Sequence, residues 1–245
     1  MNHWIATDLD GTLFSRAWAA PDAVPATWRI EPATGDRVPS SWMHPSIHRT
    51  MMALQQIATL VPVTARDADS FARVDIHGLA LTGLAIIANG AVVLDCEGRP
   101  DPVWETEMIH RLETWQDWLN ERLNLLLELS CGHARPRLVD GPPGLSAYLV
   151  AKAETGWWES DTGRGIRDGI DWTGCRLSLI GNELQVLPPG VGKFDALSAV
   201  TARHFGGRRP MLCFGDMPAD LEFMRFGEIL ATPRQSPLEK AWPES

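Results

Sequence analysis

Hydrophobic and polar positions follow two different patterns along residues 1–90. Apolar residues three and four apart predict a helix over residues 47–58, capped by Ser46, and a shorter helix over residues 67–74. Continuous apolar runs predict buried strands at residues 4–8, 60–63 and 84–88. Strands and helices that alternate in this way are typical of a parallel sheet with helices packed against it.

The segment that separates the first strand from the first long helix follows neither pattern. Residues 15–45 are rich in proline, which disfavours a helix and favours extended backbone. A turn near Gly35 would fold this segment back on itself. The sequence therefore predicts a flap that contains a hairpin.

The pattern changes after residue 90 and returns to alternation after residue 188. Steps of three and four from Trp104 to Leu126 predict one long amphipathic helix. Strands are predicted at residues 135–139, 146–151, 176–180 and 183–187, the last two joined by a tight turn at Gly181-Asn182. Helices at residues 194–204 and 219–226 then alternate with strands at residues 211–214 and 229–232.

These patterns predict an α/β fold with an insertion. Residues 1–90 and 189–245 would form a Rossmann-like core with a parallel sheet. Residues 91–188 would form an inserted α+β domain.

Composition and charge narrow the classes of partner. The chain has 22 Lys plus Arg against 31 Asp plus Glu, and its net charge of -9 disfavours binding to nucleic acid or to an anionic membrane. The most apolar stretch, residues 78–94, is short for a membrane span and is interrupted by glycine and asparagine. The first residues lack the pattern of a signal peptide, and the four cysteines are isolated, so we expect a cytoplasmic protein with reduced thiols.

Four polar clusters follow predicted strands or precede a predicted helix. In a doubly wound sheet, the carboxyl ends of the strands converge on one crevice, so these clusters would meet there. Several aspartates together make an all-oxygen site suited to Mg²⁺, while a threonine hydroxyl and a lysine ammonium suit the oxygens of a phosphoryl group. The clusters are Asp8-Leu9-Asp10-Gly11-Thr12, Thr64-Ala65-Arg66, Gly192-Lys193 and Gly215-Asp216-Met217-Pro218-Ala219-Asp220.

The clusters resemble the four motifs of the haloacid dehalogenase (HAD) superfamily. Residues 8–13 resemble the first motif, Thr64 the second, Lys193 the third, and Gly215-Asp216 with Asp220 the fourth. The inserted domain, the tripeptide Asn89-Gly90-Ala91 and the Pro-x-Gly-x-x-Lys sequence that ends at Lys193 resemble subclass IIB. That subclass includes Cof-type and sucrose-phosphatase-like sugar phosphatases, and the resemblance implies that the inserted domain is a cap over the active site.

The resemblance also implies a role for each residue. Asp8 would be the nucleophile, which forms an aspartyl-phosphate, and Asp10 would be the general acid and then the general base. Thr64 and Lys193 would bind the phosphoryl group, and we assign Arg66 and Asn89 to the substrate site as well. Mg²⁺ would be held by Asp8, the backbone carbonyl of Asp10, and Asp216, with Asp220 ordering metal-bound water or Lys193.

Two positions depart from the subclass pattern. Ala219 stands where many members have asparagine, and Phe194 stands where a glycine usually follows the lysine. Neither change removes a group that the chemistry requires.

The expected substrate is a small phosphorylated metabolite, with a sugar phosphate favoured. A nucleotide or a phosphoacid stays open, and so does a phosphomutase that returns the phosphoryl group to a sugar. A non-catalytic binding protein is disfavoured because Asp8, Lys193 and the other motif residues are all present. Four residues of the inserted domain are either exposed strand residues or contacts for hydroxyls or a second anion: Arg135, Arg137, Lys152 and Asn182.

Overall fold

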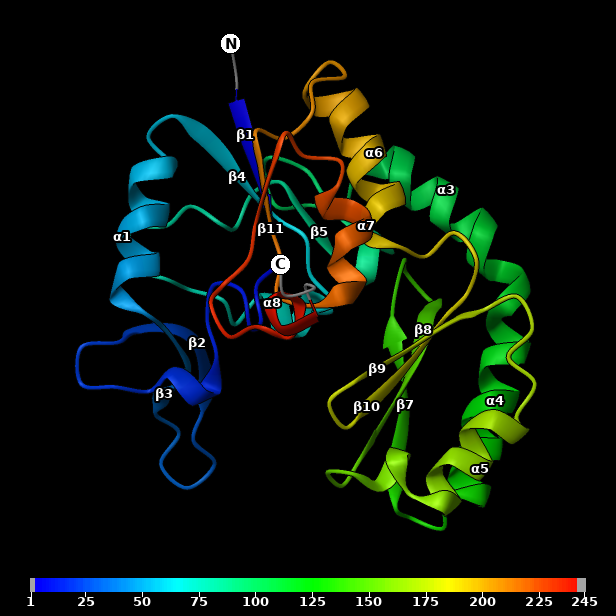
Figure 1. Ribbon diagram of the computed structural model, residues 1–245. Helices are drawn as coiled ribbons and strands as arrows, with labels where there is room; N and C mark the ends of the chain where they lie inside the picture. The colour runs from blue at the N-terminus through cyan, green and yellow to red at the C-terminus, as the bar shows by residue number, and fades with distance from the viewer. Residues whose placement is uncertain (1–2, 242–245) are drawn as a thin grey trace. The chain divides into compact units, whose positions relative to one another are not determined.

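The computed structural model describes residues 3–241, which form two compact units (Figure 1). The core unit consists of Met1–Asp101 and Lys193–Ser245, and the inserted unit of Pro102–Gly192. Residues 91–101 lie in the core unit rather than in the insertion, because β6 (Val92–Leu94) pairs antiparallel with β5 (Ala85–Ile87). Residues 189–192 lie in the inserted unit rather than in the core. None of the helices among the described residues is both long enough and apolar enough to cross a membrane.

A four-stranded parallel sheet lies at the centre of the core unit, which confirms the predicted α/β fold. Its strand order is β12-β11-β1-β4, and every neighbouring pair is parallel. An isolated parallel bridge between Val63 and Ile86 brings β5 alongside β4. The strands are β1 (His3–Thr7), β4 (Ala58–Pro62), β11 (Leu212–Phe214) and β12 (Ile229–Ala231).

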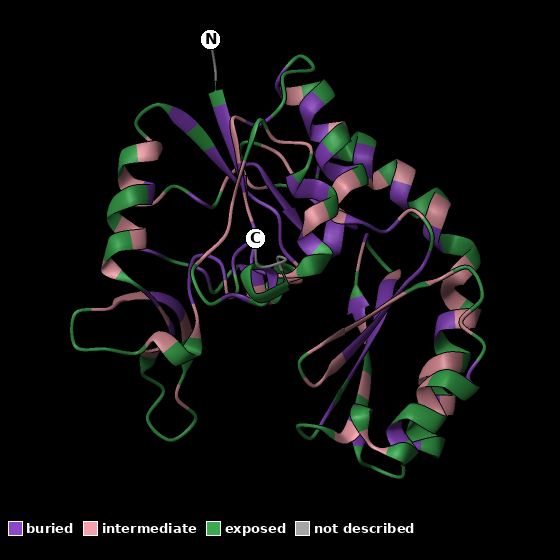
Figure 2. Ribbon diagram, in the orientation of Figure 1, coloured by how far each residue is buried: buried purple, intermediate pink, exposed green. Residues whose placement is uncertain are grey.

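Helices lie on both sides of this sheet, with α1 (Pro45–Leu54) on one side and α6 (Lys193–His204) and α7 (Leu221–Met224) on the other (Figure 1). The central strands are largely buried (Figure 2). This arrangement leaves the loops at the strand ends to carry the polar residues of the motifs.

Several helix boundaries differ from the prediction. The first long helix begins at Pro45, where proline suits the first turn, and its cap is His44 rather than Ser46. It ends at Leu54, so Ala58 belongs to the next strand. The short helix α2 (Ala68–Phe71) is capped by Asp67, whose side chain accepts a hydrogen bond from the Ser70 N–H. A further helix, α8 (Pro237–Ala241), was not predicted.

The predicted flap is an antiparallel hairpin of β2 (Val24–Ile30) and β3 (Arg37–Met43). Paired backbone hydrogen bonds join Trp42 of β3 to Ser15. On the other edge, the Trp28 N–H donates to the Arg73 carbonyl, and the Asp75 N–H donates to the Ala26 carbonyl. The hairpin is thus attached at both of its edges.

The inserted unit contains a four-stranded antiparallel sheet in the order β7-β8-β10-β9. All four strands were predicted, including the turn at Gly181-Asn182, whereas α5 was missed. Helices α4 and α5 lie along one face of this sheet (Figure 1). The elements are α3 (Pro102–Leu112), α4 (Gln116–Leu129), β7 (Ala134–Asp140), β8 (Ser146–Ala153), α5 (Asp161–Gly169), β9 (Arg176–Ile180) and β10 (Glu183–Leu187).

The single long helix predicted from Trp104 to Leu126 is wrong, because a 3₁₀ turn at Glu113–Trp115 separates α3 from α4. The side-chain amide of Gln116 donates to the Leu112 carbonyl, which satisfies a carbonyl at the end of α3. A 3₁₀ turn has three residues, so the apolar spacing continues through the break and hides it from the sequence pattern.

We expect Trp4 to stabilise the strand that leads to Asp8. Its indole is buried, stacks on Phe205 with a centroid distance of 4.3 Å, and donates from Nε1 to the Arg208 carbonyl. Replacement Trp4→Ala should lower the free energy of unfolding by about 3 to 5 kcal/mol, because it leaves a large cavity. Urea denaturation measures this, and a loss below 1 kcal/mol on the same scale would contradict the packing argument.

Candidate active site

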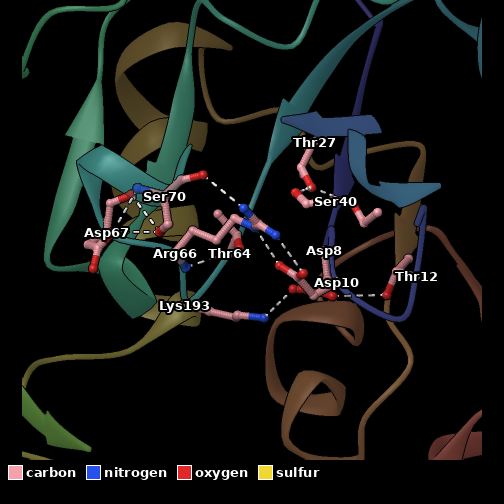
Figure 3. Close-up of polar contacts among 11 residues, drawn as sticks. Asp8, Asp10, Thr12, Thr27, Ser40, Thr64, Arg66, Asp67, Ser70 and Lys193 are labelled. Atoms are coloured by element: carbon pink, nitrogen blue, oxygen red, sulfur yellow. Dashed lines mark hydrogen bonds and ion pairs between the residues drawn. The ribbon is translucent and has the colours of Figure 1, made fainter. Parts of the chain in front are cut away.

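Asp8 follows β1, and both of its carboxylate oxygens accept hydrogen bonds from side chains (Figure 3). Its backbone N–H donates to the Phe214 carbonyl, which continues the pairing of β1 with β11. Lys193 Nζ lies 2.8 Å from Oδ1, and Thr12 Oγ1 donates to Oδ2 at 3.0 Å. Asp8 is also buried, so its carboxylate is fixed by two hydrogen-bond donors and shielded from solvent.

Two further aspartates complete a buried carboxylate triad with Asp8. Asp8, Asp216 and Asp220 each offer one oxygen, and these oxygens lie within 4.8 Å of one another. Lys193 Nζ donates to Asp220 Oδ1 at 2.7 Å, and the Met217 N–H donates to Asp220 Oδ2 at 3.1 Å. The predicted contact between Asp220 and Lys193 is present in the structure.

The turn at Gly11 allows Asp216 to approach the first motif. Gly11 has a φ of +82°, and a Cβ atom on it would lie 2.2 Å from Asp216 Oδ2. Thr12, the next residue, donates from Oγ1 to Asp216 Oδ1 at 3.3 Å, in addition to its contact with Asp8. Thr12 thus links the two carboxylates, a role that the sequence analysis missed although the residue lies four positions after Asp8.

The triad carries more negative charge than the single lysine can balance. Burial raises the pKa of Asp8 to about 7; Lys193 opposes this shift, while Asp220 and Asp216 add to it. Burial, reinforced by Asp220, raises the pKa of Asp216 to about 6. Burial lowers the pKa of Lys193, but Asp220 and Asp8 outweigh it and the net pKa is raised, so Lys193 is charged. The three carboxylate oxygens lie close together beside a single ammonium group, and this arrangement fits a small divalent cation such as Mg²⁺.

Asp10 points toward Arg66 rather than into the triad. Its carboxylate accepts a two-pronged ion pair, from Arg66 Nε to Oδ2 at 2.5 Å and from Nη2 to Oδ1 at 2.7 Å (Figure 3). The predicted metal ligand of Asp10 is its backbone carbonyl, which the side-chain geometry does not test, so that assignment stays a prediction. The Asp10 side chain is 56% exposed and therefore accessible to solvent.

Arg66 was assigned to substrate binding, but its guanidinium is committed to protein groups. Two nitrogens bind Asp10, and Nη1 donates to the Ser70 carbonyl at 2.8 Å. The guanidinium also lies 5.2 Å from the centroid of the Phe14 ring. Asp67 fixes Ser70 in turn, by accepting from its backbone N–H and its hydroxyl. These contacts hold the fork of Arg66 toward Asp10.

Thr64 and Asn89 lie on adjacent loops that are hydrogen-bonded to each other. The Asn89 N–H donates to the Thr64 carbonyl at 3.0 Å, and the Thr64 N–H donates to the Ile86 carbonyl at 2.9 Å. The Thr64 hydroxyl accepts from the Arg66 N–H at 3.2 Å. Asn89 is buried in a left-handed conformation with a φ of 52°. Their predicted contacts with substrate stay predictions.

Phe194 and Ala219 occupy structural positions beside the site. Phe194 packs edge-on against Phe226 at a centroid distance of 5.7 Å, so the aromatic ring anchors the first turn of α6 next to Lys193. Ala219 is exposed in the 3₁₀ turn Pro218–Asp220. Neither residue displaces a member of the triad.

No family model and no curated protein sequence matches the chain, but solved structures do. The C-terminal domain of trehalose-6-phosphate phosphatase from C. albicans matches with a TM-score of 0.60 and 12% identity, over 92% of this chain and 73% of that one. A HAD subclass IIB sugar phosphatase matches with a TM-score of 0.56 and 13% identity, over 97% and 90% of the two chains. The chain has the HAD fold.

A third structure supports the same fold assignment. The sucrose-phosphatase of Synechocystis sp. PCC6803, solved with sucrose and phosphate, matches with a TM-score of 0.53 and 14% identity. The match covers 100% of this chain and 90% of that chain. The likeness thus includes both the core unit and the inserted unit of the HAD fold, in agreement with the fold class predicted from sequence.

We expect Gly11→Ala to damage the site through a steric contact. The new Cβ would force Asp216 away, and the positive φ adds backbone strain of about 1 to 3 kcal/mol. Gly35→Ala is a matched control, because Gly35 has a φ of +75° and nothing within 4 Å of its Cβ position. Urea denaturation should show a loss of stability from backbone strain in both variants. Titration with Mn²⁺ should show weakened binding in Gly11→Ala alone. Equal Mn²⁺ affinity in the two variants would contradict the role of Gly11.

Proposed function

We propose that this protein is a Mg²⁺-dependent phosphatase that hydrolyses a small phosphomonoester, favouring sugar phosphates. The observation that carries the proposal is the buried Asp8 carboxylate, held between Lys193 and Thr12 and adjacent to Asp216 and Asp220. The three similar proteins are a trehalose-6-phosphate phosphatase, a sugar phosphatase and a sucrose-phosphatase, which supports the same reaction class.

Asp8 is the proposed nucleophile. One carboxylate oxygen attacks phosphorus in line with the leaving oxygen, so an O–P bond forms to Asp8 as the bond to the leaving alkoxide breaks. Lys193 Nζ, 2.8 Å from Asp8 Oδ1, offsets negative charge on the nucleophile and on the transferred group. Thr12 holds the other oxygen and so restricts rotation of the carboxylate.

Asp10 is the proposed general acid and base. In its protonated form it gives that proton to the leaving alkoxide; it then takes a proton from the water whose oxygen bonds to phosphorus as the Asp8 O–P bond breaks, which releases inorganic phosphate and returns Asp10 to its protonated form. Its exposure gives it access to both the leaving group and water. Arg66 acts as a positioning residue, because its guanidinium fixes the direction of the Asp10 carboxylate.

Asp8, Asp216 and the backbone carbonyl of Asp10 are the proposed Mg²⁺ ligands, with Asp220 in support. When bound, the cation supplies positive charge that favours ionised Asp8 and offsets the repulsion between carboxylate and phosphate. Asp220 also holds Lys193 in place through the contact at 2.7 Å.

We also propose that the protein acts in the cytoplasm on a small metabolite rather than on nucleic acid or a membrane. All four cysteines are free thiols, in keeping with a reducing compartment. The net charge of -9 disfavours polyanionic partners.

Replacement of the nucleophile tests the reaction. Asp8→Asn keeps the side-chain shape and should lower phosphate release from p-nitrophenyl phosphate and sugar phosphates at least about 1,000-fold. EDTA should abolish the activity of the unmodified protein, and Mg²⁺ should restore it. Asp36→Asn, at an exposed position of the hairpin loop, is the matched control and should retain full activity.

The same assays separate a hydrolase from a phosphomutase and from a non-catalytic binding protein. Phosphate release without a bisphosphate activator favours the hydrolase over a phosphomutase. Full activity of Asp8→Asn would refute the assignment of the nucleophile, and absence of any turnover by the unmodified protein would favour a binding role.

Arg66 can be tested as a positioning residue. Arg66→Ala should lower kcat about 100-fold on a sugar phosphate while changing KM little, because Asp10 loses its orientation. The loss should be smaller on p-nitrophenyl phosphate, whose leaving group needs no proton, and added guanidinium should restore part of the lost rate. Arg37→Ala removes an exposed ion pair with Asp75 and serves as the control. A rise in KM alone would instead indicate direct binding of substrate by Arg66.

A further inference from the structure

Three side-chain hydroxyls lie together on the β2–β3 hairpin, and they are named here the hydroxyl cluster: Thr27, Ser40 and Ser41. Thr27 Oγ1 lies 2.8 Å from Ser40 Oγ and 2.6 Å from Ser41 Oγ. Thr27 and Ser41 are each 3% exposed, whereas Ser40 is half-buried. Ser40 is therefore the member of the cluster that a ligand can reach.

A β-bulge brings both serines to the same threonine. Thr27 pairs with Ser41 and Trp28 pairs with Pro39, so Ser40 is an extra residue on β3. Consecutive side chains of a regular strand point to opposite faces, and in that geometry Ser40 and Ser41 could not both contact Thr27. Bulges are common next to active sites, where they redirect a side chain. The bulge thus turns Ser40 toward the hydroxyl cluster.

The hydroxyl cluster has one more hydrogen than its own contacts use. Each of the three hydroxyls carries one hydrogen, and the two contacts with Thr27 take up two of them. Among residues 3–241, these hydroxyls make no other hydrogen bond. One hydrogen therefore remains to donate, and lone pairs on the same oxygens remain to accept. A donor left without a partner in a largely buried position is unfavourable, so the cluster favours a ligand that bonds to it.

The hydroxyl cluster lies on the same unit as the candidate active site, between the loops of Asp10 and Arg66. Backbone hydrogen bonds tie the hairpin to Ser15 on one side and to residues 73–75 on the other. All of these residues, like the carboxylate triad, belong to the core unit. Figure 3 draws members of the cluster in one close-up with the Asp10–Arg66 ion pair.

We propose that the hydroxyl cluster binds a hydroxyl group of the substrate's leaving group, with Ser40 as the contact and Thr27 and Ser41 as positioning residues. A sugar or polyol hydroxyl both donates and accepts, which matches the remaining hydrogen and lone pairs of the cluster, whereas an anion only accepts. This inference rests on the proposed phosphatase activity. It makes the cluster the feature that selects polyol phosphates over alkyl phosphates.

Matched substrates test the inference. Sorbitol 6-phosphate and hexyl phosphate have the same six-carbon chain, with and without hydroxyl groups. Ser40→Ala should lower kcat/KM on sorbitol 6-phosphate about tenfold, mainly through KM, because one hydrogen bond to the substrate is lost. The same variant should leave kcat/KM on hexyl phosphate unchanged. Deoxy derivatives of sorbitol 6-phosphate locate the contact, since the one that lacks the bound hydroxyl should be insensitive to Ser40→Ala.

Two further variants separate the contact from its support. Thr27→Val keeps the shape of the side chain but removes the central oxygen, so Ser40 loses its orientation; we expect a loss of roughly threefold on sorbitol 6-phosphate alone. Thr34→Ala is the matched control, because it removes an exposed hydroxyl at the turn of the same hairpin, and it should leave both substrates unchanged. An equal loss on both substrates would show that the cluster serves only the hairpin or an ordered water, and would overturn the inference, as would no loss on either.

The two proposals fail in distinguishable ways. Turnover of p-nitrophenyl phosphate and hexyl phosphate, with no effect of Ser40→Ala specific to sorbitol 6-phosphate, would leave the phosphatase proposal intact and refute the hydroxyl cluster as a binding site. If no substrate is hydrolysed, the phosphatase proposal fails, and calorimetric titration with sorbitol 6-phosphate still tests the cluster. Binding that Ser40→Ala weakens and Thr34→Ala keeps would support the site. Absence of binding, or equal binding by both variants, would refute it.

Discussion

The ammonium group of Lys193 lies between two buried carboxylates, 2.8 Å from Asp8 and 2.7 Å from Asp220. A buried ion without a partner costs several kcal/mol, so each of these groups depends on the others for its charged state. The three residues come from different parts of the chain, after β1, before α7 and at the start of α6. This ion cluster therefore fixes both the charge of the site and the packing of the elements around it.

The sequence pattern was sufficient for the layers of the fold and insufficient for its boundaries. The strands β1 and β11 could be predicted because each contains a short apolar run, Trp4-Ile5-Ala6 and Leu212-Cys213-Phe214, too short for a helix. The break between α3 and α4 could not be predicted, because it depends on the side chain of Gln116 bonding to Leu112 and to Ser146 across the unit. Contacts of that kind are set by tertiary structure and leave no periodic signal.

The candidate site shows the same division. Asp8, Lys193, Asp216 and Asp220 could be predicted to meet, because loops after parallel strands converge at one sheet edge. The partner of Arg66 could not be predicted, since a guanidinium near a phosphate site can bind either substrate or a carboxylate. The structure shows that the fork is held toward Asp10 by Ser70 and Phe14.

The β2–β3 hairpin connects the two loops that carry Asp10 and Arg66. One edge is bonded to Ser15, shortly after Asp10, and the other to residues 73–75, shortly after Arg66. Separation of these loops would have to break both sets of backbone hydrogen bonds at once. The hairpin and the two loops should therefore open as one cooperative unit, with shared hydrogen-exchange protection, so the acid-base pair is kept together by the backbone as well as by its own charges.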